Sequence, residues 1–180
     1  SRPGLARHLT EAGAEVELRR LAERKRWVNR AITACTRCAV LGCTVIATLF
    51  VGVLDPAAGR ISYCNAGHEY PMLFRSDGRV ERLSVGGIAL GVLDSFPYEE
   101  GSVTLDPGDF LVIYSDGIPD ATDELGTFFG EERLLECIRT NATLGAEALT
   151  QRIVDSVCAH EREAARADDL TIVVVKRLPK

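Results

Sequence analysis

The chain has 180 residues, 46% of them hydrophobic and 26% charged, which is typical of a globular protein and excludes a disordered or low-complexity segment. Its 21 Lys and Arg against 26 Asp and Glu give a net charge of −5, which argues against nucleic-acid binding. We find no apolar run long enough to span a membrane and no signal peptide, and therefore predict a cytoplasmic protein with reduced cysteines.

We expect one domain over residues 1–180, with a helical part over 1–43 and a sheet core with two helices over 44–180. Apolar residues recur at helical spacing through residues 5–32. β-branched residues then predominate over 44–54 and predict the first strand. Further strands are predicted, in chain order, over 60–64, 71–75, 79–83, 98–105, 110–114 and 170–175. Helical spacing returns over 130–139 and 146–160. This order favours an α+β fold of sheets packed with helices in layers.

Acidic residues stand at the ends of two predicted strands. Asp116 comes just after the apolar run 110–114, and Asp168 and Asp169 come just before the last predicted strand. If these strands are antiparallel neighbours, the carboxylates converge at one edge of a sheet. Carboxylate oxygens are ligands that Mg²⁺ and Mn²⁺ prefer, and Gly117 would let the backbone approach closely. The alternative for each motif alone is a turn or a cap.

Several motifs occur in the order found in a known family. They are Ala47 to Asp55, Asn65-Ala66-Gly67-His68 with Pro71, Tyr114-Ser115-Asp116-Gly117-Ile118-Pro119-Asp120-Ala121, Phe129-Gly130 and Asp168-Asp169-Leu170-Thr171. Together they resemble the signature of bacterial PPM phosphatases, the metal-dependent, type-2C-like serine/threonine phosphatases of the SpoIIE and RsbU group. The resemblance runs from about residue 44 to residue 177, which is most of the chain.

The resemblance implies an αββα sandwich, in which two mainly antiparallel sheets lie between helical layers. It also implies a two-metal Mn²⁺ or Mg²⁺ site with Asp116 and Asp168 as metal ligands and catalytic residues. Gly117, Asp120 and Asp169 would surround these ligands, with Asp169 positioning the loop and Asp120 holding an outer water. In the family, a metal-activated water attacks the phosphorus directly. The implied partner is a phosphorylated regulatory protein, a STAS-type anti-anti-sigma factor, in sigma factor regulation.

The family's first acidic motif, whose aspartate bridges the two metals, is not found. The only acidic residues before Asp55 are Glu11, Glu15, Glu17 and Glu23, all within the predicted helix. We therefore expect an N-terminally incomplete PPM fold holding two metals, one or none. Two hypotheses stay open: a protein phosphatase domain, or a catalytically impaired phosphatase-fold module that binds a regulatory protein. The sequence leaves the substrate-binding residues unassigned and the oligomeric state open, a homodimer included.

Other candidate sites give weaker signals. Cys35 and Cys38, with Cys43 nearby, could suggest zinc or redox chemistry, but no second Cys/His pair follows and structural thiols are favoured. His68 could contact phosphate or act as a general acid, although a structural role is favoured. Ser115 lacks the Gly-x-Ser-x-Gly context of a nucleophile.

Overall fold

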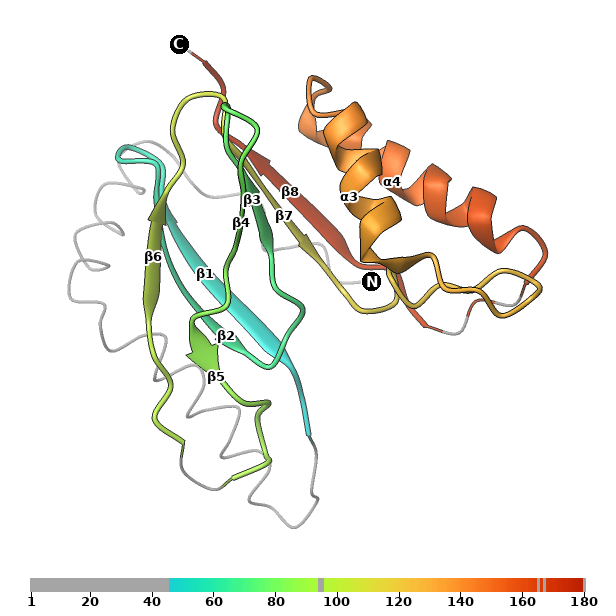
Figure 1. Cartoon of the computed structure of the whole chain (residues 1–180). Helices are drawn as coiled ribbons and strands as arrows, with labels where there is room; N and C mark the ends of the chain where they lie inside the picture. Colours follow the sequence, from blue (N-terminus) through green and yellow to red (C-terminus); the bar gives the residue numbers. More distant parts are fainter. Residues whose placement is uncertain (1–45, 94–95, 165, 167, 180) are drawn as a thin grey trace, which may run out of the picture. The chain divides into compact units, whose positions relative to one another are not determined.

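The computed structural model describes residues 46–93, 96–164, 166 and 168–179 (Figure 1). The predicted helix over 5–32 and the cysteines at 35, 38 and 43 lie outside the described residues. The chain divides into two compact units, one of Ser1–Gly67 with Gly86–Ser102 and the other of His68–Val85 with Val103–Lys180. Each unit is described by itself below.

The first unit is built on a β-hairpin. β1 (Leu49–Asp55) pairs antiparallel with β2 (Arg60–Ala66), and the turn between them is closed by the Asp55 carboxylate, which accepts backbone N–H bonds from Ala57 and Ala58. On β2, Cys64 and Ala66 are buried together with Leu90 and form a small core. Two shorter strands also pair with β2, namely β5 (Gly86–Gly87), which runs parallel to it, and β6 (Gly101–Thr104).

The second unit is a four-stranded antiparallel sheet covered by two helices on one face (Figure 1). Its strand order is β4-β3-β7-β8. The four strands are β3 (Met72–Phe74), β4 (Val80–Arg82), β7 (Phe110–Tyr114) and β8 (Ile172–Lys176). The helices are α3 (Gly130–Thr140) and α4 (Ala146–Glu161).

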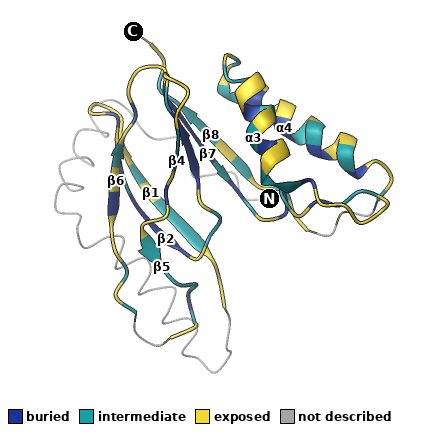
Figure 2. Ribbon diagram, in the orientation of Figure 1, coloured by how far each residue is buried: buried dark blue, intermediate teal, exposed yellow. Residues whose placement is uncertain are grey.

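The main core of this unit lies between the sheet and the helices. Alternate residues of β7 point toward the helices, because successive side chains of a strand project from opposite faces. They meet apolar residues of α3 and α4 that are spaced by three or four positions. Figure 2 shows buried positions on both helices. The fully buried members of this cluster include Met72, Val112, Tyr114, Leu134, Ile138, Leu149, Ile153 and Val157.

The predicted elements of this unit occur at nearly the predicted positions, and 110–114 has the predicted bounds. The run Leu170 to Val175 predicts a buried strand, and this prediction was wrong. Among the described strands β8 has only β7 as a neighbour, and Val173 is 47% exposed. Ile172 and Val174 pack on the core while Val173 points to the other face, so the apolar run conceals an ordinary alternation.

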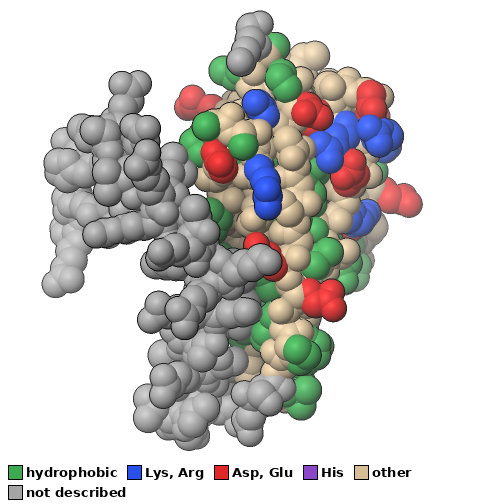
Figure 3. Space-filling model, turned by 90° about the vertical axis from the view of Figure 1, so that its left-hand side faces the viewer, with side chains coloured by type: hydrophobic (Ala, Val, Ile, Leu, Met, Phe, Trp, Pro, Cys, Tyr) green, Lys and Arg blue, Asp and Glu red, His purple; other side chains and the backbone are tan. Residues whose placement is uncertain are grey.

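The surface is mixed in charge. Figure 3 shows basic and acidic side chains interspersed on one face of the described part of the chain. Within the described residues, no helix has both the length and the apolar character needed to cross a membrane.

Candidate active site

The pairing of β7 with β8 brings the candidate metal ligands to the same end of the sheet. The strands are antiparallel neighbours, which is the condition under which the carboxylates were expected to converge, and Tyr114 lies opposite Ile172. Beyond this pair, Ser115 N–H donates to the Thr171 carbonyl at 3.0 Å. The Ser115 hydroxyl accepts from Thr171 N–H at 3.0 Å and donates to the Asp169 carbonyl at 3.1 Å. The residues after β7 are thus fastened to those before β8.

The loops that carry Asp116 and Asp168 touch at Gly117. A Cβ atom added to Gly117 would lie 2.5 Å from the Asp169 carbonyl oxygen and 3.5 Å from the Cβ of Asp168. The first of these distances is too short for any side chain at this position. Glycine is therefore required here by a close approach of backbone to backbone, as the sequence suggested.

Asp116 and Asp168 are both exposed and have acceptor capacity to spare. The Oδ1 atom of Asp116 accepts a bond from Gly117 N–H at 3.0 Å, and that of Asp168 accepts one from Asp169 N–H at 2.7 Å. Among the described residues neither carboxylate has a basic partner. Two such carboxylates on touching loops fit one hydrated divalent cation, which prefers oxygen ligands and retains several waters.

The described residues do not complete a multidentate centre. In the part of the chain that the structure describes, no group of three or more His, Cys, Asp and Glu residues gathers to hold a metal ion. The loop nevertheless adds another exposed carboxylate, since Asp120 N–H donates to the Asp116 carbonyl at 2.9 Å and closes a turn. Asp169 contributes its backbone, and its side chain is exposed.

Further groups come to the same end of the sheet from β3 and β4. Met72 lies opposite both Val112 and Arg82, so the segment before β3 and the end of β4 run toward the Asp116 end. His68 in that segment is half-buried, with Nδ1 lying 2.9 Å from the Glu69 carbonyl oxygen. This contact is local and does not test the structural role favoured for His68, which stays a prediction.

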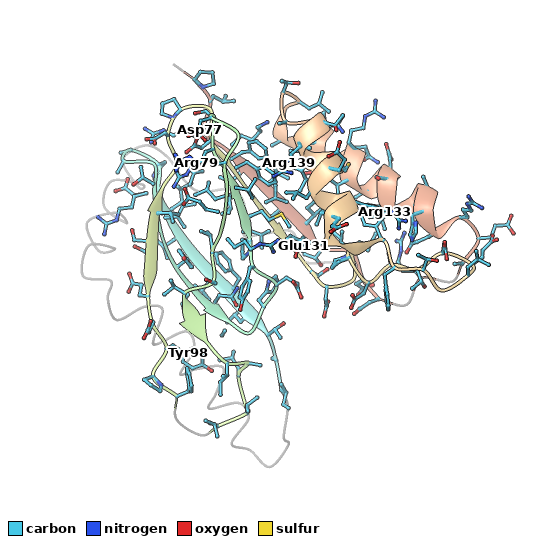
Figure 4. All side chains as sticks on the ribbon, in the orientation of Figure 1. Asp77, Arg79, Tyr98, Glu131, Arg133 and Arg139 are labelled. Carbon is cyan, nitrogen blue, oxygen red and sulfur yellow. The ribbon has the colours of Figure 1, made fainter. Side chains whose placement is uncertain are left out.

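An ion pair between Arg82 and Glu131 links the end of β4 to the first turn of α3 (Figure 4). The buried Tyr114 hydroxyl makes no hydrogen bond to any described residue. Burial, and then the charges of Glu131 and Glu69, raise the pKa of Tyr114. Sequence reasoning missed this cluster because nothing in the local pattern connects residues so far apart along the chain.

Comparison with known proteins fits this geometry. A profile of the family described as Stage II sporulation protein E (SpoIIE) matches residues 4–178. The chain belongs to the SpoIIE family. It is 36% identical over 133 residues to protein IcfG of Synechocystis and 26% identical over 131 residues to phosphoserine phosphatase RsbU of Bacillus subtilis. These matches cover 74% and 72% of the chain but only 21% and 38% of the two relatives.

Solved structures show the PPM phosphatase fold for this SpoIIE-family chain. The phosphatase domain of SpoIIE from Bacillus subtilis, presoaked with Mn, has a TM-score of 0.61 at 20% identity and covers 97% of this chain and 77% of its own. The RsbU and RsbW domains of Rv1364c from Mycobacterium tuberculosis give 0.65 at 24% identity, covering 84% of this chain and 42% of that one. The predicted family and fold class are thereby confirmed.

Proposed function

We propose that this chain is a metal-dependent protein serine/threonine phosphatase domain that hydrolyses phosphoserine or phosphothreonine on a regulatory protein. The observation that supports it most is the pairing of β7 with β8, which puts Asp116 and Asp168 on touching loops. Family membership supports the reaction class, and the relative RsbU is named a phosphoserine phosphatase.

In this proposal Asp116 and Asp168 hold the Mn²⁺ or Mg²⁺ ions. When bound, such cations supply a water of lowered pKa and neutralise charge on the phosphate. Asp120 orients an outer water, and the Asp169 backbone holds the loop through Ser115. The Ser115 hydroxyl is engaged on both sides, by the Asp169 carbonyl and Thr171 N–H, which makes it a poor nucleophile, and the proposed mechanism uses water and no phosphoenzyme.

The proposed partner is a phosphorylated regulatory protein of the STAS type, an anti-anti-sigma factor, acting in the cytoplasm. Two relatives support this part of the proposal. One is RsbU itself, and the other is a solved protein whose RsbU domain occurs with an RsbW domain. A protein substrate also suits the site, because both candidate ligands are exposed and a phosphorylated side chain can reach them from solvent.

A second function is a catalytically impaired phosphatase-fold module that binds its regulatory partner without hydrolysis. The observation that favours it is the set of described carboxylates, which contains no third ligand beside Asp116 and Asp168. Two-metal hydrolysis needs ions held about 3.5–4 Å apart, which generally requires a bridging ligand.

Phosphate release from a phosphoserine protein distinguishes the two functions. The phosphatase proposal expects Mn²⁺-dependent turnover that falls at least about 100-fold in Asp168→Asn, since loss of a metal ligand removes several kcal/mol of transition-state stabilisation. Asp77→Asn, a change at an exposed aspartate in the β3–β4 turn, is the matched control and should leave turnover unchanged. Absence of turnover together with retained binding of the phosphoprotein would favour the impaired module.

A further inference from the structure

The segment between Asp116 and α3 ends in a tip with two exposed apolar side chains. Leu125 is 90% exposed and Phe128 is 61% exposed. Single exposed apolar residues are ordinary on protein surfaces, but two within four positions of one turn require a reason. The next residue, Phe129, is buried in the core. Two adjacent aromatic residues of this turn therefore differ, one packing inside and the other, Phe128, facing solvent.

The backbone of this tip is held in one shape. Asp123 accepts N–H bonds from Leu125 at 2.9 Å and from Thr127 at 2.8 Å through the same oxygen. The Thr127 N–H bond holds the pKa of Asp123 below its ordinary value. At the base of the turn, Phe129 N–H donates a hydrogen bond to the Ala121 carbonyl at 2.7 Å. The exposure of the two apolar side chains is thus built into a defined turn.

Side chains from both helices contact backbone carbonyl groups of the tip. Arg133 of α3 donates to the Phe128 carbonyl at 2.8 Å, and Nε2 of His160 in α4 lies 2.8 Å from the Thr127 carbonyl oxygen. The Phe129 ring packs edge-on against His160 with 5.6 Å between centroids. Figure 4 shows Arg133 and Glu131 at the end of α3 that adjoins this turn. A turn fixed in this way loses little conformational entropy when its tip is covered by a partner.

The segment is strongly acidic. Residues 116–132 contain six acidic residues and no Lys or Arg, and Arg133, which donates to the Phe128 carbonyl, brings the sum over 116–133 to −5, equal to the net charge of the whole chain. Glu131 is paired with Arg82, but Glu124 beside the tip and Glu132 in α3 are exposed and have no basic partner among the described residues. Just past α4, Arg162 and Glu163 add one charge of each sign and leave the balance as it is.

We propose that residues 122–129, here called the tip hairpin, form the docking element for the phosphoprotein substrate. The occupant is a substrate segment with an apolar side chain for Leu125 and Phe128 and with Lys or Arg side chains facing Glu124 and Glu132. The apolar contact supplies affinity, and the basic side chains provide steering and register. The inference rests on the proposed function, because the tip hairpin follows directly on the Asp116–Asp120 turn.

Synthetic phosphoserine peptides test this proposal. Peptides of about 15 residues span up to about 50 Å when extended, enough to reach from the metal site to a neighbouring turn. One set flanks the phosphoserine with Lys and Leu, a second with Glu and Leu, and a third with Ser and Gly. Phosphate release with Mn²⁺ gives kcat/KM for each set, and p-nitrophenyl phosphate reports the chemistry without docking. Fluorescence anisotropy of labelled peptides reports binding independently of turnover.

We expect the Lys-Leu peptides to exceed the Glu-Leu peptides at least tenfold in kcat/KM, mainly through KM. Leu125→Ser with Phe128→Ser should remove this preference while leaving p-nitrophenyl phosphate hydrolysis and the melting temperature unchanged. Leu178→Ser, at another strongly exposed leucine, is the matched control and should keep the preference.

The outcomes separate docking from catalysis. Turnover with equal kcat/KM for all sets would overturn the docking proposal and leave the proposed function standing. Without turnover of any substrate, tighter anisotropy binding of the Lys-Leu peptides that the double variant abolishes would support docking while the proposed function fails. If there is no turnover and the peptide sets bind equally or not at all, both the docking proposal and the proposed function would be overturned.

Discussion

An aspartate stands at each end of β7, and the two aspartates differ in their burial and in their hydrogen bonding. Asp109, just before the strand, is 1% exposed and accepts bonds from Arg75 at 2.8 Å, Ser76 N–H at 2.8 Å and Asp106 N–H at 2.9 Å. Asp116, just after it, is exposed, and among the described residues its carboxylate accepts only the N–H of its neighbour Gly117.

This difference separates a structural carboxylate from one that is available to a ligand. Burial alone would raise the pKa of Asp109, but its hydrogen bonds to Arg75, Asp106 and Ser76 lower that pKa overall. Its charge is already neutralised by the fold. Asp116 stands beside the loop of a second exposed aspartate, Asp168, and among the described residues no basic side chain pairs with either carboxylate.

The largest effect is expected at the buried end. Asp109→Ala should lower the free energy of unfolding by about 2–4 kcal/mol, because it leaves the Ser76 and Asp106 N–H groups without their acceptor and removes one partner of Arg75, which keeps Glu81. Urea unfolding measures this cost. Asp77→Ala, at an exposed aspartate paired with Arg79, is the control and should shift the midpoint far less. Equal shifts would mean that the Asp109 cluster contributes no more than a surface pair.

At the Asp116 end of β7, the neighbouring strand β8 contributes contacts to the core. Ile172, opposite Tyr114, packs against the main core, whereas Val173 is half exposed. Ile172→Ala should cost about 2 kcal/mol and Val173→Ala less than about 1 kcal/mol. Thermal or urea unfolding of the two variants compares them directly. A larger cost at Val173 would show that its exposed face is covered in solution.

Acid should remove the stabilising contribution of the buried Asp109. The folded-state pKa of Asp109 lies below its unfolded value of about 4, so its stabilising contribution is complete above pH 4 and is lost as the pH falls through the folded value. The stability difference between the wild-type chain and Asp109→Asn should therefore narrow below about pH 4. A difference that stays constant from pH 6 to pH 3 would contradict the assigned ionisation.

Tyr114 links the core to the exposed end and should give the smallest change. Its buried hydroxyl has no hydrogen-bond partner among the described residues, so Tyr114→Phe should be neutral or stabilise by about 1 kcal/mol. Tyr70→Phe at an exposed tyrosine is the control. Clear destabilisation by Tyr114→Phe would show that the hydroxyl is hydrogen-bonded in solution, with the Glu131 carboxylate as the candidate acceptor.

Much of the second unit could be predicted from sequence because its signals are local. The short apolar run 110–114 gave β7 directly, and spacings of three and four gave α3 and α4. The approach of Asp116 to Asp168 was inferred on the assumption that the two strands beside them pair, and β7 and β8 do pair. In contrast, Asp-Pro-Gly-Asp over 106–109 indicates only a turn, because the partner of Asp109 is Arg75, 34 positions away.

β5 was missed for a different reason. Gly86 and Gly87 have no side-chain pattern to interpret, and the strand exists because their backbone can approach Asn65, where a Cβ atom on Gly86 would collide with the Asn65 carbonyl. Such a strand is visible only once its partner is placed. The same limit applies to the Arg82–Glu131 pair, whose members come from β4 and α3.

Calorimetric titration with Mn²⁺ tests the central claim most directly, namely that Asp116 and Asp168 form a cation site. The account predicts weak binding by the wild-type chain, because two carboxylates hold one hydrated ion loosely. Binding should be lost in both Asp116→Asn and Asp168→Asn, with no loss of metal-free stability, and retained in Asp77→Asn. Absence of binding at millimolar Mn²⁺, or binding that survives both substitutions, would contradict the claim.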